Sequence, residues 1–592
     1  MILSTHGKAW STKMRPFIYA VALLLIAPFA AADPLDPLID AYQAYVNEAN
    51  PAEAARAAGT TPSAWGTVTP QAVAERAGKA MVLRSEIESA QTDRATDKAI
   101  LVRLLTEDID NADYDTARIP FTGDWGFQAE PIFAAMQTSI ADEAEGEAWI
   151  ARLNDVPRYF AENVENMRRG LATGWVASAD PLKVSTDQIR EQIFDDPSES
   201  GLYKPFLSLP DDMDPAVATR LRADGLAAVA NAIDAYRQTL AFIETDYAPH
   251  TRSGAGIADL PRGREAYMAD IEHHTAGAGY TPVEIHELGL SEVARIRGEM
   301  EDILKEIHFE GSFKDFQDFL RKDPAFYAKT PDELMAKAKA VAAKMDAMLP
   351  TYFGKLPKHW YNVEPVPAAI APGYTSGRYV EGDPEEDRAG TYLVNTYALD
   401  QRPLYELPAL TAHEAVPGHH LQIMLAMEME GQPRFRRQYY ATAFGEGWGL
   451  YAEHLAMEAG MNETPYERFG ALSMEMWRAC RLVADTGLHW YGWTRAQAEE
   501  CFNENTALAP LNIQNEVTRY MGWPGQATAY KIGELKILSL RKEAEEALGD
   551  KFDIRAFHDA VLSQGSVPMD VLQSNIEHWI NCQKDKAAAA AP

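Results

Sequence analysis

A group of histidine and glutamate side chains between positions 413 and 446 has the composition of a hydrolytic metal site. The stretch HEAVPGHH contributes His413, Glu414, His419 and His420, and Glu446 follows in the stretch FGEGWG. A catalytic zinc site needs about three protein ligands, an open position for water, and a carboxylate that takes a proton from that water. Imidazole nitrogens and carboxylate oxygens are ligands that Zn²⁺ prefers. These residues therefore predict a Zn²⁺ site in which Glu414 is the catalytic base.

The spacing of the histidines departs from the common zinc motif H-E-x-x-H, in which the two histidines lie one helical turn apart. Here Pro417 stands where the second histidine would be. On a regular helix, a residue six positions after His413 lies about 240° around the axis, and one seven positions after it lies about 10 Å along the axis. Proline removes a backbone hydrogen bond and glycine accepts unusual dihedral angles, so Pro417-Gly418 predicts a bulge. A two-residue bulge places His419 in the ligand position and a three-residue bulge would place His420 there; we favour His419.

The third ligand is expected from a following helix. Glu446 has a glycine on each side, and these glycines would let another chain or a substrate approach closely. Glu453 lies two turns further along the same face, where it would orient a histidine ligand through a hydrogen bond. A buried histidine is more often a hydrogen-bonded core residue than a ligand. The pair His273-His274 has no such neighbours and is expected at the surface.

The elements that must position these residues are mostly helical. Apolar residues recur with a helical rhythm through 215–245, which predicts one long amphipathic helix. Thr281 and Thr330 are each followed by a proline and, three residues on, by a glutamate, which is a helix start signal. Between about residues 362 and 404, turn-forming residues surround the β-type segment GTYLVNTYAL. The expected fold is mainly α, a large helical body with a deep cleft and a small β-sheet next to the zinc helix.

Charge and the N-terminal sequence limit the location and the partners. The 592-residue chain has a net charge of −32 without a basic patch, which excludes a nucleic-acid-binding protein. Lys13 and Arg15 precede an apolar run that ends in three alanines, which predicts a signal peptide over 1–32, cleaved after Ala32. A retained N-terminal anchor is the alternative. No later segment has the roughly 20 apolar residues of a membrane span, so a periplasmic or secreted protein is expected.

The three cysteines are too few for a disulfide framework, but Cys480 and Cys501 could pair in an oxidising compartment. The third, Cys582, is distant in sequence. None of them lies at the predicted cleavage point, where a lipid would be attached.

Three longer motifs, HEAVPGHHLQ, EGWGLYAE and RYMGWPGQATAYKIGELKI, resemble the bacterial domain-of-unknown-function 885 family, with similarity from near residue 35 to the C-terminus. The third motif is also similar, more distantly, to the thermostable carboxypeptidase (Taq) family, whose relatives include angiotensin-converting enzyme and thimet oligopeptidase. That resemblance implies a helical enzyme with a deep channel, in which two histidines and a downstream glutamate hold zinc. It further implies that Tyr530 stabilises the oxyanion and that Arg519 binds the C-terminal carboxylate of a substrate. A core tyrosine and an internal salt bridge are the alternatives for these two residues.

The segment TYLVNT, residues 391–396, is similar to the edge strand with which the wider zinc-peptidase class binds an extended peptide. Asn395 would then add a side-chain hydrogen bond to the substrate. An internal hairpin without a substrate role is the alternative.

These features predict that residues 33–592 form a helical zinc-peptidase-like domain of two lobes, with the zinc motifs in roughly 360–540. The expected function is an exported zinc-dependent hydrolase that cleaves amide bonds of short peptides, of the carboxypeptidase or oligopeptidase type. A zinc amidohydrolase that acts on a non-peptide amide would use the same residues. A metal-stabilised binding protein is the third alternative, although a structural zinc has no need of the base Glu414.

Overall fold

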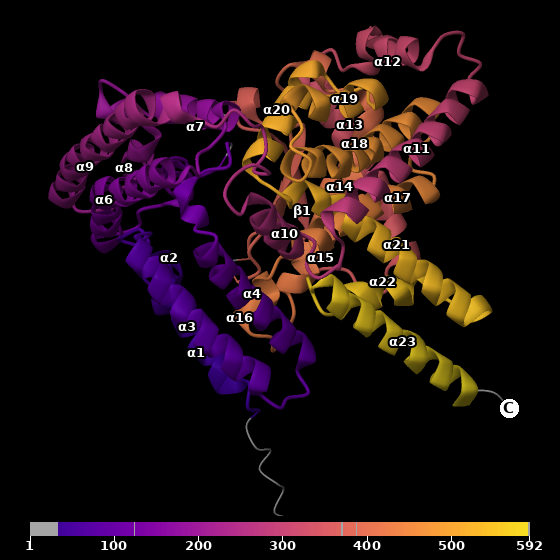
Figure 1. The fold of residues 1–592 in the computed structure, drawn as a ribbon, viewed down its shortest axis with the longest axis horizontal. Helices are drawn as coiled ribbons and strands as arrows, with labels where there is room; N and C mark the ends of the chain where they lie inside the picture. Colours follow the sequence, from indigo (N-terminus) through magenta and orange to yellow (C-terminus); the bar gives the residue numbers. More distant parts are fainter. Residues whose placement is uncertain (1–32, 124, 369–370, 386, 590–592) are drawn as a thin grey trace, which may run out of the picture.

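The computed structural model describes residues 33–123, 125–368, 371–385 and 387–589. The predicted signal peptide lies outside the described residues. The described chain is mainly helical, as the sequence predicts, and its helices form two groups that lie side by side (Figure 1). No helix in the described part is both long and apolar enough to cross a membrane.

The first group contains the N-terminal helices. Its largest hydrophobic cluster runs from Trp65 to Tyr247 and is separate from the clusters of the second group. The predicted amphipathic helix over 215–245 is confirmed as α9, and its last turn continues into a short π-helix. The helices of this group are α1 (Asp36–Ala49), α2 (Pro51–Ala58), α3 (Pro70–Ser89), α4 (Ala95–Asp113), α5 (Glu130–Gln137), α6 (Glu143–Thr173), α7 (Ala179–Glu191), α8 (Lys204–Leu207) and α9 (Pro215–Phe242).

The second group contains the residues of the predicted metal site. Both helix start signals are confirmed, because the Thr281 and Thr330 side chains accept hydrogen bonds from the N–H groups of Glu284 and Glu333. The helices of this group are α10 (Gly263–His274), α11 (Pro282–Glu306), α12 (Phe313–Lys322), α13 (Pro331–Tyr352), α14 (Leu407–Glu414), α15 (His419–Met427), α16 (Arg434–Gln438), α17 (Thr442–Glu458), α18 (Pro465–His489), α19 (Arg495–Asn505), α20 (Pro510–Gly522), α21 (Ala529–Leu548), α22 (Ile554–Leu562) and α23 (Met569–Ala589).

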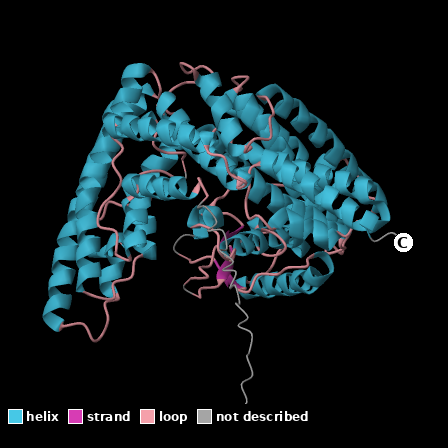
Figure 2. Cartoon of the chain, turned by 90° about the horizontal axis from the view of Figure 1, so that it is seen from below, coloured by secondary structure: helices cyan, strands magenta, loops and turns pink. Residues whose placement is uncertain are grey.

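A small sheet precedes the metal-site helices, as predicted, and it is a minor part of the helical molecule (Figure 2). It contains β1 (Tyr361–Pro365), β2 (Gly377–Val380) and β3 (Gly390–Val394) in the order β1-β3-β2. Strand β3 pairs in parallel with β1 and antiparallel with β2. The segment TYLVNT therefore lies in the central strand, and the prediction that it forms a peptide-binding edge is wrong.

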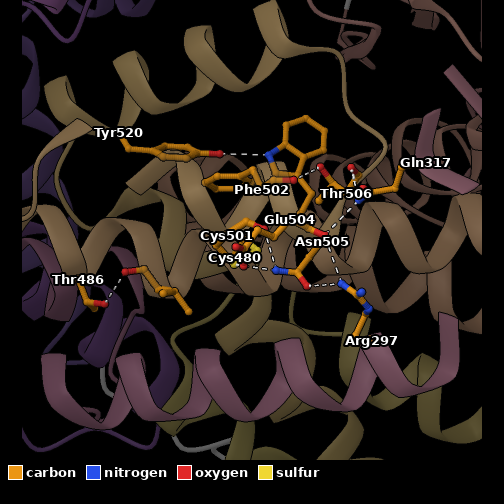
Figure 3. The surroundings of a disulfide bond; sticks show 12 residues. Arg297, Gln317, Cys480, Thr486, Cys501, Phe502, Glu504, Asn505, Thr506 and Tyr520 are labelled. Carbon is orange, nitrogen blue, oxygen red and sulfur yellow. Dashed lines mark hydrogen bonds between the residues drawn. A yellow bond between two sulfur atoms is a disulfide. The ribbon is translucent and has the colours of Figure 1, made fainter. Parts of the chain in front are cut away.

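A disulfide bond joins Cys480 of α18 to Cys501 of α19, with 5.7 Å between their Cα atoms. The C-terminal end of α19 is also held by side chains from two other helices (Figure 3). Arg297 of α11 donates to Asn505, and Gln317 of α12 donates to the carbonyl of Thr506. The covalent bond thus fixes α19 against the long helix α18, and the polar contacts fix its end against α11 and α12.

Candidate metal centre

The zinc motif folds as two helices joined by a tight break. Helix α14 ends at Glu414 and α15 begins at His419, so the predicted bulge is a complete interruption. The Val416–Pro417 peptide bond is cis, and the Pro417 carbonyl accepts a hydrogen bond from the indole of Trp448 at 2.7 Å. A Cβ at Gly418 would lie 2.0 Å from the carbonyl oxygen of His413, which only glycine avoids. The break changes the direction of the chain between His413 and His419.

His413, His419 and Glu446 converge on one point. One ligand atom from each lies within 4.8 Å of the other two. The Nε2 atoms of His413 and His419 lie 3.4 and 3.5 Å from Oε2 of Glu446, and the two imidazole rings are perpendicular. Bonds of about 2.0–2.1 Å in a tetrahedral zinc site separate neighbouring ligand atoms by about 3.4 Å. These three residues therefore fit Zn²⁺ and leave one coordination position for water or substrate.

The orientation of His413 is set from two sides. Its Nδ1 atom lies 2.8 Å from Oε1 of Glu453, which in turn pairs with buried Arg478 at 3.2 Å. A Cβ at Gly449 would lie 2.7 Å from the imidazole, so the ring packs directly on the backbone of α17. The structure thus places Glu453 where the sequence predicts, behind a ligand rather than among the ligands.

The charges in the site favour a cation. Burial lowers the pKa of His413, but the Glu446 and Glu453 carboxylates outweigh burial and raise this pKa to about 9. The same carboxylate–imidazole contacts hold the pKa of Glu446 well below its usual range, although burial opposes this shift. A metal ion would take over the stabilisation that these groups now obtain from a proton.

His420 points away from the three converging residues. Its Nδ1 atom lies 3.0 Å from the hydroxyl of Tyr379, and its ring contacts Tyr361. Burial lowers the pKa of His420 to about 4. Of the two adjacent histidines, His419 therefore lies with His413 and Glu446, as the two-residue argument predicts, and His420 packs against the sheet.

Glu414, the predicted base, lies between the metal-binding residues and the sheet. Its Oε2 atom accepts a hydrogen bond from the backbone N–H of Tyr379 at 2.8 Å. Tyr379 belongs to β2, so this N–H points away from the partner strand β3, toward the open edge of the sheet. The other carboxylate oxygen of Glu414 has no protein partner among the described residues. The edge strand next to the site is thus β2 rather than the predicted TYLVNT segment.

Asn395, the predicted substrate-binding residue, does not reach the site. It is fully buried, and its amide nitrogen donates to the carbonyls of Ala371, Tyr374 and Thr375. Its amide oxygen accepts from the N–H of Tyr397. Because both sides of the amide are engaged within the chain, Asn395 stabilises the loop before β2, and its predicted contact with substrate is corrected.

Tyr440 is a site residue that sequence reasoning missed. Burial raises the pKa of Tyr440 well above its usual range, and the nearby Glu446 carboxylate and Tyr530 add to this shift. A Cβ at Gly445 would lie 2.2 Å from the Tyr440 ring, so this glycine makes room for the tyrosine. The ring remains 41% exposed. The sequence indicates Gly445 as a position of close approach, but it does not identify Tyr440 as the residue that packs there.

Tyr530, the predicted oxyanion donor, belongs to α21 and lies near Tyr440. Its hydroxyl is 3.5 Å from the amide nitrogen of Gln526, and the Arg481 guanidinium stacks over its ring at 4.3 Å. The structure thus brings Tyr530 to the border of the site, with Tyr440 closer to the metal-binding residues.

The guanidinium of Arg519, the predicted carboxylate-binding residue, already forms hydrogen bonds within the protein. Its guanidinium donates to Glu516 at 3.1 Å and to Gln526 at 2.6 Å. Arg481 also donates to Glu516, at 2.9 Å, while its buried Nη1 atom has no partner among the described residues. Two guanidinium groups therefore share one carboxylate, which leaves positive charge near Tyr530 for a substrate anion.

Two neighbouring cavities lie near the site, and Tyr440 lines the smaller one. The smaller, of 250 Å³, is lined by Tyr440 and by residues of α4, α10 and α16. The larger, of 530 Å³, lies between the N-terminal helices and α10, α20 and the turn after α20. The two cavities share Glu107 and His273 in their walls. His274, predicted at the surface, is only 7% exposed and lines the larger cavity, so that prediction is wrong.

Comparison with known proteins gives a family and a fold. Residues 51–576 match the family model described as bacterial protein of unknown function (DUF885). A crystal structure titled "putative lipoprotein" from Colwellia psychrerythraea is 28% identical and superposes with a TM-score of 0.85, covering 93% of this chain and 100% of that one. A "putative lipoprotein of unknown function" from Shewanella oneidensis, at 16% identity, shares the fold with a TM-score of 0.69 over 91% of this chain and 98% of that one. No protein of curated function matches the sequence at a significant level.

Proposed function

This chain belongs to the bacterial DUF885 family, and from its site we propose that it is an exported zinc-dependent hydrolase that cleaves amide bonds of short peptides. The observation that carries the proposal is the convergence of His413, His419 and Glu446 within 4.8 Å, with the free carboxylate oxygen of Glu414 beside them. A structural zinc site has four protein ligands and needs no base, whereas three ligands and an adjacent carboxylate suit hydrolysis.

The residues around the metal position have separate roles in this proposal. Zn²⁺ bound there would polarise a water molecule and the scissile carbonyl. Glu414 takes a proton from the water and delivers it to the leaving amine. Tyr440, with Tyr530 near it, donates a hydroxyl hydrogen bond to the oxygen that becomes negatively charged. Glu453 keeps the Nδ1 hydrogen of His413 in place, so that Nε2 faces the metal.

Strand β2 would hold an extended peptide next to Glu414. Tyr379 directs its N–H out of the sheet toward that carboxylate, so the outer edge of β2 runs past the reacting groups. Edge strands bind peptides through backbone hydrogen bonds. Arg519 and Arg481, beyond Tyr530, would bind a substrate carboxylate, which fits a peptide with a free C-terminus.

Two observations support export. The Cys480–Cys501 disulfide bond is stable in an oxidising compartment and rare in the cytosol. The two similar solved structures are described as lipoproteins, and lipoproteins are exported. In this chain the cysteines are at 480, 501 and 582, so the lipid attachment that the word implies does not carry over to the predicted cleavage point.

The test is digestion of a peptide library by the zinc-loaded protein, with and without chelator. We expect cleavage that chelator abolishes and zinc restores, because the proposed water activation needs the metal. Glu414→Gln should retain zinc but lose activity by about 10²–10⁴-fold. His419→Ala should lose zinc, whereas the matched variant His420→Ala should retain it.

Three results would contradict the proposal. Cleavage that survives Glu414→Gln would refute the role of the base. Zinc loss in His420→Ala but not in His419→Ala would refute the ligand set. Stoichiometric zinc with no cleavage of any peptide, but hydrolysis of non-peptide amides, would instead identify an amidohydrolase with the same catalytic residues.

A further inference from the structure

The wall of the 530 Å³ cavity between the two groups of helices has more acidic than basic side chains. Four carboxylates line it: Glu107 and Asp110 of α4, Glu130 of α5 and Asp270 of α10. Arg252 is the one arginine or lysine in the wall. Its guanidinium donates to the backbone carbonyls of Val176, Ala255 and Met521 rather than to any of the carboxylates.

None of these carboxylates forms a salt bridge with an arginine or lysine of the described chain, although Arg152 and Arg84 lie near enough to oppose the rise in the pKa values of Glu130 and Asp110. The side-chain carboxyl groups of Asp110 and Asp270 form no hydrogen bond or ion pair with the rest of the described chain. Glu107 pairs only with His273, at 3.2 Å, and burial lowers the pKa of that histidine to about 4, so it is neutral at physiological pH. Glu130 accepts one hydrogen bond, from the Tyr159 hydroxyl. These carboxyl groups are therefore available to pair with a cationic ligand.

Burial and mutual repulsion raise the pKa values of these groups. Burial is the main cause at Asp270, where the charges of Asp485, Glu107 and Asp110 add to it and the pKa rises to about 8. Burial and Asp108 raise the pKa of Glu107 to about 7. Asp485, packed behind Asp270, accepts hydrogen bonds from the Tyr267 hydroxyl and the N–H of Gly525. A ligand cation would relieve this repulsion.

Aromatic and polar groups complete the wall. Trp125 and Trp523 line the cavity and remain 46% and 36% exposed, so their rings are available to a ligand. Ser178 and His274 are more than nine-tenths buried, and each has a polar atom, Oγ and Nδ1, with no hydrogen-bond partner among the described residues. Tryptophan faces attract organic cations, and unpaired buried polar atoms indicate a polar ligand.

The arrangement does not suit a metal ion. Within the described part of the chain, His413, His419 and Glu446 are the group of three whose ligand atoms are close enough to hold one. The cavity carboxylates come from α4, α5 and α10 and are spread around a volume of 530 Å³. A volume of this size with aromatic walls suits an organic group instead.

We propose that this cavity binds an organic cation, a guanidinium or alkylammonium group, between Asp270, Glu107 and Asp110, with Trp125 and Trp523 over its apolar stem. The cavity shares Glu107 and His273 with the smaller one, whose wall includes Tyr440, and the Tyr440 ring packs against Gly445, next to Glu446. On the proposed function, on which this step rests, the cation is the basic side chain or amino group of the peptide substrate.

The test measures binding directly, so that it does not depend on catalysis. N-acetyl-arginine amide and N-acetyl-citrulline amide have nearly the same shape, but only the first carries a charge. Titration calorimetry and tryptophan fluorescence with the zinc-loaded full chain should show at least about tenfold tighter binding of the arginine compound. Binding of the arginine compound should tighten from pH 6 to pH 8.5, because Glu107 and Asp270 lose their protons in that range while the guanidinium stays charged.

Variants separate the cavity from the general acidity of the chain. Asp270→Asn and Glu107→Gln should each reduce the preference for the arginine compound at least threefold. Glu287→Gln removes the same charge from an exposed position of α11 and should leave the preference unchanged. Circular dichroism establishes which variants fold. One folded variant, either Asp270→Asn or Glu107→Gln, is enough for the test.

Equal affinity for the arginine and citrulline compounds would overturn the inference. It would also be overturned if Glu287→Gln weakened binding as much as the folded cavity variants, since the attraction would then come from net charge alone. If the cation binds as expected but no peptide is cleaved, the cavity assignment stands and the proposed hydrolysis fails.

Discussion

At the scale of single residues, three glycines help to position the residues of the predicted metal site, because a side chain in their place would collide with those residues. Gly449 allows the His413 ring to lie against α17, Gly445 makes room for Tyr440, and Gly418 lets the chain turn beside the His413 carbonyl. These glycines have no chemical role of their own. A substitution at such a position would act on the site by moving a ligand.

Gly449→Ala is therefore expected to impair zinc binding without removing any ligand. The added Cβ would lie 2.7 Å from Cε1 of His413, so the ring must rotate or α14 must shift. We expect zinc affinity to fall about 10–100-fold, the size of effect seen when a ligand's supporting contacts are lost. Competition with a fluorescent chelator measures this change.

Gly298→Ala is the matched control for that variant. Gly298 lies within α11, and a Cβ there meets no atom within 4 Å. This substitution should leave zinc affinity unchanged and should stabilise the helix slightly, because alanine has the higher helix propensity. Equal zinc affinity in both variants would show that His413 is not held by its packing on Gly449.

At the scale of elements, close crossings and one covalent bond hold the second group together. Helices α17 and α21 approach so closely at Gly447 and Gly533 that a Cβ at Gly533 would lie 1.8 Å from the carbonyl of Ala443. That crossing brings Tyr530 of α21 beside the metal-binding helix. On the other side of α21, the Lys531 ammonium is completely buried and pairs with Glu475 and Glu534 at 2.6 Å.

The disulfide bond between α18 and α19 should contribute to stability. It closes a loop of 21 residues, and a loop of that size is worth about 3 kcal/mol through the entropy of the unfolded chain. Replacing Cys480 and Cys501 together by alanine should lower the free energy of unfolding by roughly this amount, as measured by urea denaturation. A reducing agent should shift the wild-type curve in the same direction.

Cys582→Ala serves as the control for the disulfide experiment. This cysteine is free, so its replacement should change neither the urea curve nor its response to the reducing agent. An identical response of the wild type and the double variant to reduction would show that the bond does not stabilise the fold.

At the scale of the whole molecule, the predicted metal site joins three helices of the second group. The three residues come from α14, α15 and α17, and the nearby cavities are lined by both groups of helices. An ion that binds only the folded chain stabilises it by mass action, by about 2.7 kcal/mol at a free concentration of 100 times Kd. Zinc should therefore act as a stability factor as well as a cofactor.

Calorimetry should detect this coupling as a change in melting temperature. We expect added zinc to raise Tm by a few degrees and chelator to reverse the rise. Glu446→Gln should abolish most of the response, because it weakens one of three ligands. A response to zinc that is unchanged in Glu446→Gln would place the stabilising ion elsewhere.

The sequence by itself determined the helical class and many helix starts, and it predicted the group of His413, His419 and Glu446 and a possible pairing of Cys480 with Cys501. Each depends on signals within a few residues: the apolar rhythm of α9, the threonine caps of α11 and α13, and the residue types around His413 and Glu446. Such local preferences can be read from one chain because they act between neighbours along it.

Only the tertiary structure decided the central place of β3, the burial of Asn395 and His274, the packing of Tyr440 on Gly445, and the acidic cavity. These features depend on contacts between residues far apart in sequence. Strand order follows from which segments pair, and the lining of a cavity follows from how helices pack. Neither leaves a periodic signal in the segment itself, so the same local sequence is compatible with an edge or a central strand, and with a surface or a buried histidine.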